Sequence, residues 1–250
     1  VTWAPDSSEL YFDYNQRGHQ LYRILAANAQ TGAVRVVVEE TSKTFIHYSG
    51  KSWRHWLHGS GELIWMSERD GWCHLWLYDV KTGQPKHQIT KGQWPVREVL
   101  HVDEAKREIW FLASGLSAKE DPYHQHLCRV NLDGSGFQQL TAGDGNHRIE
   151  FSPKHDFFID TYSRADQAPI TELRRSSDGT LITVMEKAEA TALLAAGWTM
   201  PERFVAKGRD GKTDIHGIII TPSKLDPAKK YPIVEDIYAG PHGAFAPKDF

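Results

Sequence analysis

The sequence lacks the features that mark several classes of protein. No apolar run approaches the roughly 20 residues of a membrane-spanning helix. The net charge is only -3 over 250 residues, without a basic stripe or an acidic tail, so we expect no nucleic-acid partner. The chain opens on Val1 without a signal peptide. We therefore expect a piece of a longer protein, whose compartment the sequence leaves unknown.

Cysteine is scarce as well. Cys73 and Cys128 are the two in the chain, and each lies in a strand-like run at a related position of a repeat. Their offsets from the neighbouring Leu75 and Leu127 differ by an odd number, which places them on opposite faces of equivalent strands. We expect two free, partly buried thiols. The thirteen His include no His-x-x-x-His helix and there is no paired-Cys set, so we expect no metal and no cofactor.

Apolar and aromatic residues are plentiful, and they recur. The chain is 40% hydrophobic and has nine Trp, enough to build a core. A pattern of a turn, two alternating apolar strands and a glycine turn repeats at a spacing of about 45 to 55 residues. The four copies start at Trp3, Trp56, Val102 and Phe151. This spacing is typical of the four-stranded blades of a β-propeller.

The repeat has a physical reason. A lone four-stranded sheet has two apolar faces, and blades stacked around an axis cover both. The matched Trp, Tyr and Phe would fill the space between blades and form no ligand cage. We predict a mainly β fold with a partial propeller of about four blades over residues 1–185, taken from a ring of seven or eight.

One blade loop has two interpretations. The run Ser67-Glu68-Arg69-Asp70-Gly71-Trp72 joins the second and third strands of the second copy, and Asp-Gly is a strong hairpin-turn signal. Its charges could line the mouth of a propeller. The structural alternative, which we prefer, is a solvated turn with a surface ion pair worth under about 1 kcal/mol.

The C-terminal part changes character. Residues 186–197 are rich in Ala and Leu and predict a short helix that ends at Gly197, within a connector over 186–200. A hairpin follows, with strands at 202–206 and 215–221. Residues 231–243 then predict a buried strand that runs into a tight turn, with Tyr238 at its mouth. His242 would more readily face solvent than line a cleft.

These residues carry a resemblance. The hairpin motifs Asp210-Gly211 and Ile215-His216-Gly217, then Lys230-Tyr231-Pro232 and Asp236-Ile237-Tyr238-Ala239-Gly240-Pro241, follow a propeller. In this order they resemble the prolyl oligopeptidase family of serine peptidases, within it the dipeptidyl peptidase IV group. The resemblance covers most of the chain from about Trp56 onward. It implies that residues 201–250 begin an α/β-hydrolase domain.

The resemblance also implies a chemistry. Members of the group release dipeptides from peptides with Pro or Ala at the second position, and the tyrosine that matches Tyr238 donates its hydroxyl to the oxyanion. No Gly-x-Ser-x-Gly elbow occurs here, so the Ser-Asp-His triad would lie beyond Phe250 and this piece would be inactive alone. Glu39-Glu40 is a tempting amine-binding pair, but its blade position is wrong, so we reject it. The supporting Arg cannot be identified.

Three hypotheses compete. The first, which we favour, is part of a serine exopeptidase. The second is a non-enzymatic propeller that binds proteins, in which Tyr238 is one more aromatic residue. The third is a propeller glycosidase, but its required pair of carboxylates is not evident. Because a cut propeller exposes apolar blade faces, we also expect self-association.

Overall fold

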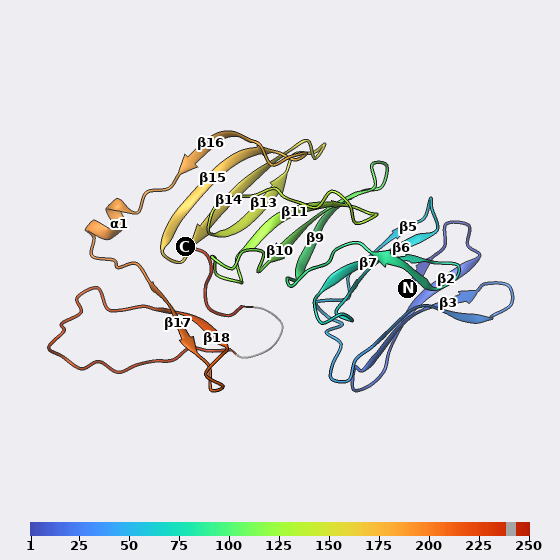
Figure 1. Cartoon of the computed structure of the whole chain (residues 1–250), viewed down its shortest axis with the longest axis horizontal. Coiled ribbons are helices and arrows are strands. Elements are labelled where there is room, and N and C mark those ends of the chain that lie inside the picture. The colour runs from blue at the N-terminus through green and yellow to red at the C-terminus, as the bar shows by residue number, and fades with distance from the viewer. Residues whose placement is uncertain (239–243) are drawn as a thin grey trace. The chain divides into compact units, whose positions relative to one another are not determined.

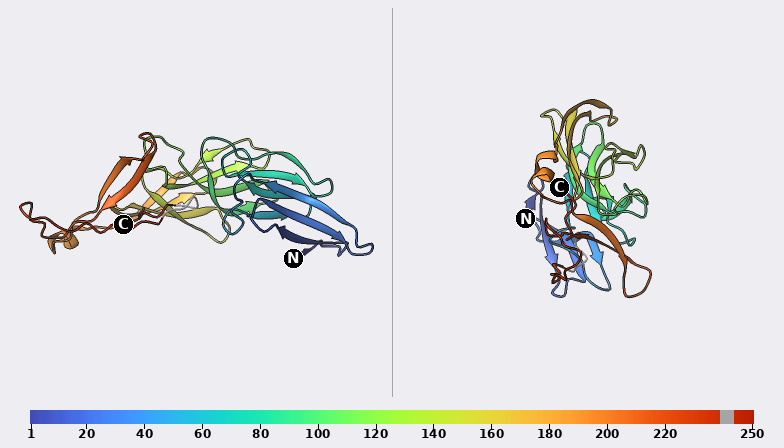
Figure 2. Two further views of the ribbon diagram at one scale, coloured as in Figure 1. Left: turned by 90° about the horizontal axis from the view of Figure 1, so that it is seen from below. Right: turned by 90° about the vertical axis from the view of Figure 1, so that its left-hand side faces the viewer.

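The fold is nearly all β (Figures 1 and 2). In the computed structural model, residues 1–238 and 244–250 are described. The chain divides into two compact units, one made of Val1–Ala113 with Cys128–Gln138, the other of Ser114–Leu127 with Gln139–Phe250. Over the part of the chain that is described, no helix has the length and apolar character to cross a bilayer.

Four sheets of four strands each make up residues 2–187, and in each sheet the strands are neighbours in chain order. Neighbouring strands pair antiparallel in the first, second and fourth sheets. In the third sheet, β9 (Val96–Asp103) and β10 (Glu108–Ser114) pair antiparallel as well. These are the blades that the repeat predicts, and the partial propeller is confirmed. Their strands are β1 (Thr2–Trp3), β2 (Glu9–Asn15), β3 (Leu21–Asn28), β4 (Val34–Thr41); β5 (Arg54–Leu57), β6 (Glu62–Ser67), β7 (His74–Asp79), β8 (Gln84–Gln88); β9 (Val96–Asp103), β10 (Glu108–Ser114), β11 (Gln125–Asn131), β12 (Gln138–Gln139); β13 (Asn146–Phe151), β14 (Phe157–Arg164), β15 (Gln167–Arg175), β16 (Leu181–Lys187).

Aromatic rings fill the space between the first two sheets. Tyr22 on β3 stacks on Trp65 of β6 with ring centroids 5.7 Å apart. Tyr11 on β2 stacks on Trp56 of β5 at 4.3 Å. Tyr11, Tyr22 and Trp65 belong to a single buried cluster that draws on both sheets. The matched aromatic residues therefore act as core, since each ring covers apolar surface that its own sheet leaves open.

A buried set of polar groups lies in the second sheet, where β7 begins and the chain leaves β8. The Thr90 hydroxyl accepts the backbone N–H of Leu75 at 2.9 Å. It also lies 3.0 Å from Nδ1 of His74, within hydrogen-bond distance. The other ring nitrogen of His74 donates to the Gly92 carbonyl at 3.0 Å. Every polar atom of the set has a partner, which buried groups require.

Both cysteines are free, as the sequence predicts, and they are fully buried where the sequence predicts partial burial. The pKa of the Cys73 thiol is raised to about 12, and burial is the largest cause. Burial also raises the pKa of Cys128. Both thiols are therefore protonated at neutral pH, and they pack as small apolar side chains.

The second unit also contains the helix and the hairpin that follow the fourth sheet. Helix α1 spans Thr191–Ala195, shorter than the predicted 186–197, because β16 continues to Lys187 and pairs it with Ile170. Gly197, with φ of 93°, follows the helix. Strands β17 (Glu202–Lys207) and β18 (Asp214–Ile219) pair antiparallel in a two-stranded sheet (Figure 1).

The predicted strand over residues 231–243 does not form in its described part. Residues 231–238 are in no strand, and Ile233 and Val234 are 95% and 88% exposed. A strand exists only when a neighbour accepts its backbone hydrogen bonds, and among the described strands none pairs with this segment. The sequence pattern does not show whether a neighbouring strand is available to pair with this segment. The rest of that prediction, Ala239 to Gly243, lies outside the described residues.

Glycine turns bring successive sheets together. The turn between the last two strands of each sheet contains a glycine with φ between 69° and 84°: Gly32, Gly83, Gly134 and Gly179. A Cβ on Gly83 would lie 2.6 Å from the carbonyl oxygen of Val36 in β4 of the preceding sheet. A Cβ on Gly179 would overlap the carbonyl of Leu140, next to β12. Gly32 has open space around it.

This contrast supplies a matched test. Gly32→Ala and Gly83→Ala introduce the same backbone strain, since φ is 72° and 69°. A left-handed non-glycine residue costs about 1–3 kcal/mol. Only Gly83→Ala also forces a methyl group against Val36, which adds about 1–3 kcal/mol. We expect the urea midpoint of Gly83→Ala to lie clearly below that of Gly32→Ala. Equal midpoints would show that the close approach contributes nothing.

Candidate functional site

Tyr238 is the one residue for which the sequence predicts a catalytic role. It lies in the second unit and is 71% exposed. Its ring is 5.9 Å from that of Phe245, with 44° between the planes. The phenol is thus open to solvent and rests on the segment that follows it in the chain. Since the predicted strand around it is not formed, Tyr238 lacks the rigid backbone that the prediction gave it.

The segment after Phe245 is anchored. Lys248 Nζ lies 2.7 Å from a carboxylate oxygen of Asp121 and 5.0 Å from the centre of the Tyr123 ring. Both partners belong to the connection between β10 and β11. Burial by itself raises the pKa of Asp121, but the bond from Lys248 and the backbone N–H of Tyr123 outweigh it, so the pKa is lowered. The carboxylate is therefore charged at neutral pH.

Two further bonds hold the end of the chain. Asn146, the first residue of β13, donates to Asp249 at 3.0 Å. The backbone N–H of Phe250 donates to the Ser163 hydroxyl at 3.1 Å. The Phe250 ring packs edge-on against Trp198, 5.6 Å away. The last residues are thus bound to the fourth sheet and to the junction after α1.

The charged residues of the 67–72 loop are paired within the chain. Glu68 bonds Lys51 at 2.6 Å, and Asp70 accepts from Gln88 at 2.6 Å. Arg69 lies 5.0 Å from the centre of the Trp76 ring and bonds Glu40 at 2.6 Å. Burial lowers the pKa of Arg69, but Glu40 more than offsets it and the net shift is upward. These contacts favour the structural interpretation, with Arg69 held more firmly than a solvated pair.

Glu39 and Glu40 serve different partners. Glu39 bonds Arg23 on the neighbouring strand at 2.6 Å. Glu40 is buried and accepts hydrogen bonds from the Trp65 indole at 3.1 Å and the Ser67 hydroxyl at 2.7 Å. The two carboxylates are consumed by contacts inside their own unit. Nothing in this geometry favours them as an amine-binding pair.

Two buried histidines lie in contact in the second unit, His126 from β11 and His147 from β13, with ring centroids 4.6 Å apart. His147 Nδ1 is 2.8 Å from the Asp160 carboxylate and its Nε2 is 3.1 Å from the Gly143 carbonyl. Both nitrogens therefore face acceptors. The carboxylate that faces Nδ1 is itself fully buried.

His126 is held in the neutral form. The Thr141 hydroxyl accepts the N–H of Leu127 at 3.0 Å and lies 3.2 Å from Nδ1 of His126. The other nitrogen donates to Glu120 at 2.8 Å. Burial, followed by the charge on His147, lowers the pKa of His126. The bonds repeat those of His74 and Thr90, so the arrangement is a structural device of the blades.

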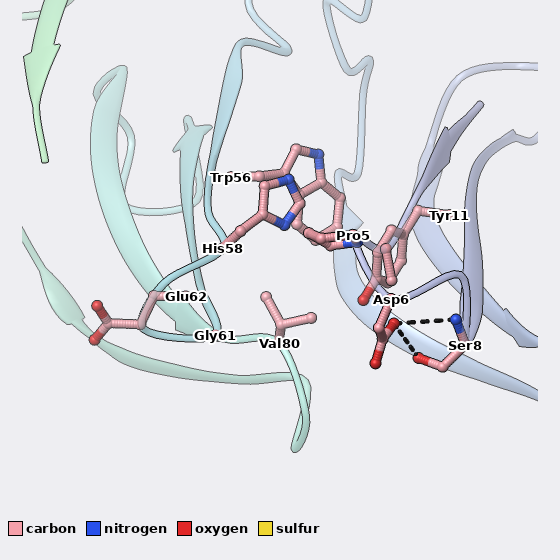
Figure 3. A pocket seen from close by; sticks show the side chains of 10 residues that line it. Pro5, Asp6, Ser8, Tyr11, Trp56, His58, Gly61, Glu62 and Val80 are labelled. Carbon is pink, nitrogen blue, oxygen red and sulfur yellow. Dashed lines mark hydrogen bonds between the residues drawn. The ribbon is translucent and has the colours of Figure 1, made fainter.

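The described residues contain no group of three or more His, Cys, Asp or Glu side chains that could hold a metal ion. One hollow of about 310 Å³ lies in the first unit, between the β1–β2 and β5–β6 turns (Figure 3). Asp6 in its wall accepts from the Ser8 hydroxyl at 2.7 Å. Glu62 bonds Lys86 and Arg107 at 2.5 and 2.8 Å. Asp6 and Glu62 are thus bonded to other side chains of the protein, and we interpret the hollow as a gap in the packing between two sheets.

Comparison with known proteins decides the family. The family described as "Dipeptidyl peptidase IV (DPP IV) N-terminal region" matches residues 1–169. The chain belongs to this family. The match covers the first three sheets and reaches into β15. The predicted resemblance to the dipeptidyl peptidase IV group is confirmed.

The curated relatives of this chain are longer. It is 29% identical over 181 residues to a probable dipeptidyl peptidase 4 of Aspergillus fumigatus, which covers 70% of this chain and 23% of that protein. It is 32% identical over 164 residues to human dipeptidyl peptidase 8, over 61% of this chain and 18% of that protein. The chain thus spans about a fifth of the length of these curated relatives.

Solved structures agree on the fold. The dipeptidyl peptidase 4 of Porphyromonas gingivalis superposes with a TM-score of 0.69 at 22% identity, over 90% of this chain and 31% of that one. A putative dipeptidyl aminopeptidase IV from Bacteroides ovatus superposes with a TM-score of 0.71 at 26% identity, over 92% and 34%. At these coverages the matches extend past residue 169, where the family match ends.

The neutral state of His126 predicts a pH dependence. A histidine with a lowered pKa binds its proton more readily when unfolded, where the pKa is about 6.5. Its contribution to stability is therefore complete above that value and is lost as pH falls toward the folded pKa. We expect the thermal midpoint to fall between pH 7.5 and pH 5.5, and to fall less in His126→Gln.

The matched control is His58→Gln, at an exposed position, which should keep the full decline. Because the pKa of His124 is lowered as well, some decline should remain in His126→Gln. An unchanged decline in His126→Gln would contradict the assignment.

Proposed function

We propose that this chain supplies the propeller and the oxyanion-binding tyrosine of a serine-type dipeptidyl peptidase. The observation that carries the proposal is the family match over residues 1–169, followed in the same chain by the Asp236-Ile237-Tyr238-Ala239-Gly240-Pro241 run. The relatives that bear dipeptidyl peptidase names support the activity.

Tyr238 has the chemistry for this role. During acyl transfer, negative charge develops on the carbonyl oxygen of the scissile bond, and a phenol O–H at 2.7–3.1 Å can donate to it. A donor of this kind is worth about 3–4 kcal/mol of barrier. The exposed phenol of Tyr238 is available to a substrate. The intact enzyme would take peptides with Pro or Ala at the second position.

The nucleophile would come from outside this chain. The sequence has no Gly-x-Ser-x-Gly elbow, which such hydrolases use to expose the serine. The 250-residue chain alone should therefore release no dipeptide. Within it we propose a propeller part over 1–185, a connector over 186–200 and the start of the hydrolase domain over 201–250. The position of α1, between β16 and β17, supports this division.

The test compares three proteins on Gly-Pro and Ala-Pro chromogenic substrates. The longer parent should release dipeptides, and a serine-directed inhibitor should stop it. Its Tyr238→Phe variant should lose about 10²–10³-fold in kcat, because one oxyanion donor is gone. The 250-residue chain should show no turnover. Inhibitor-sensitive turnover by the short chain, or an unaffected Tyr238→Phe parent, would contradict the proposal.

We also propose that this chain self-associates. Strand β16 is an edge strand whose seven residues are all exposed. Leu181, Ile182, Val184 and Met185 are among its exposed apolar side chains. Exposed, apolar strand edges tend to pair with another chain, and large apolar patches mark interaction surfaces.

Ile182→Lys places a charge on this edge and should shift the chain toward monomer. Sedimentation at tens of micromolar should show oligomers for the unmodified chain and a lower average mass for Ile182→Lys. Leu225→Lys, at an exposed position in a loop, is the control and should not change the mass. A monomeric unmodified chain would refute self-association.

A further inference from the structure

We propose that Asp121 is a positioning residue for Tyr238. Through Lys248, Asp121 fixes the segment on which the Tyr238 ring rests, and so sets where the phenol can meet an oxyanion. The inference rests on the proposed function, and it names a residue whose importance the catalytic motif does not reveal. Asp121 and Lys248 are 127 positions apart in the sequence.

Two contacts in the second unit are joined by a short stretch of backbone. The Tyr238 ring lies 5.9 Å from Phe245. Three residues further along, Lys248 reaches Asp121 at 2.7 Å. The side chains of Lys248 and Asp121 are only 12% and 8% exposed, so the ion pair is shielded from water. Removing one partner of a shielded ion pair strongly destabilises the structure around it, because the other charge stays buried without a counter-charge.

Asp121 is itself fixed from several sides. Its carboxylate accepts the backbone N–H of Tyr123 at 3.0 Å, which closes a turn in the connection before β11. His216 of β18 lies 3.9 Å away. The Tyr123 ring covers the Lys248 ammonium and lies 6.1 Å from the His216 ring. The Lys248 ammonium therefore lies in a site formed by the β10–β11 connection, with His216 of β18 beside it.

The need for such a site follows from the position of Tyr238. Residues 231–238 pair with no described strand, so their own backbone does not hold the phenol. Oxyanion donors must stand within a few tenths of an ångström of their place, and a misplacement of about 1 Å can cost about 10²-fold in rate. Among the described residues that follow Tyr238 in the chain, Lys248 forms a shielded ion pair, with Asp121.

The test is a double-mutant cycle in the full-length parent. Asp121→Asn and Lys248→Met should each lower kcat about ten- to hundredfold with KM changed less than about threefold, because the loss falls on the transition state. Lys248→Arg keeps the charge and should recover most of kcat. In a Tyr238→Phe background, Asp121→Asn should add less than about twofold, since it acts through the missing hydroxyl.

Asp178→Asn is the matched control, because it removes a carboxylate from an exposed pair with Arg175, and its kcat should be unchanged. Hydrogen exchange in the 250-residue chain gives a readout besides activity. Asp121→Asn should speed exchange in residues 244–250 about tenfold or more, and Asp178→Asn should not.

The outcomes separate the two claims. A parent that releases no dipeptides overturns the proposed function and the inference together. An active parent in which Tyr238→Phe is impaired, but Asp121→Asn and Lys248→Met keep full kcat, overturns the inference alone. Full additivity of Asp121→Asn with Tyr238→Phe also overturns it, since Asp121 would then act independently of the phenol.

Discussion

The apolar face of a β-sheet must be covered, and in this chain the first two sheets cover each other's facing surfaces. The stacked pairs Tyr11–Trp56 and Tyr22–Trp65 meet this requirement between the first two sheets. Close approach requires a turn without a side chain, and Gly83 supplies it against the Val36 carbonyl. The spacing of the repeat, the aromatic residues and the glycine turns all follow from this single packing requirement.

The requirement also explains what the sequence could predict. Blades were recognisable because packing repeats residue types from copy to copy, as in His74–Thr90 of the second sheet and His126–Thr141 of the third. The strand predicted from residue 231 was wrong over its described part, because apolar and β-branched residues such as Ile233 and Val234 indicate a strand only where a neighbour offers its edge. The helix boundary was also off, since β16 takes residues to Lys187.

The candidate site was likewise predictable only in part. Tyr238 could be named because a short local motif carries it. Its proposed support could not, because it joins Lys248 with Asp121 across 127 positions. The same holds in the first unit for the bond between Trp65 and Glu40, which are 25 positions apart. No local pattern marks such partners. Charged residues in turns, such as Arg69, are likewise indistinguishable in sequence from solvated ones, and only the structure shows the Trp76 ring beneath the guanidinium.

Tyr238 is the residue on which the proposed function depends most. The measurement that tests it most directly is a crystal structure of the full-length parent with a dipeptidyl phosphonate bound covalently to its serine, since the phosphonyl oxygen then stands in for the oxyanion. The account predicts that the Tyr238 hydroxyl lies about 2.7–3.1 Å from that oxygen. A hydroxyl farther than about 4 Å away, beyond any hydrogen bond, would contradict it.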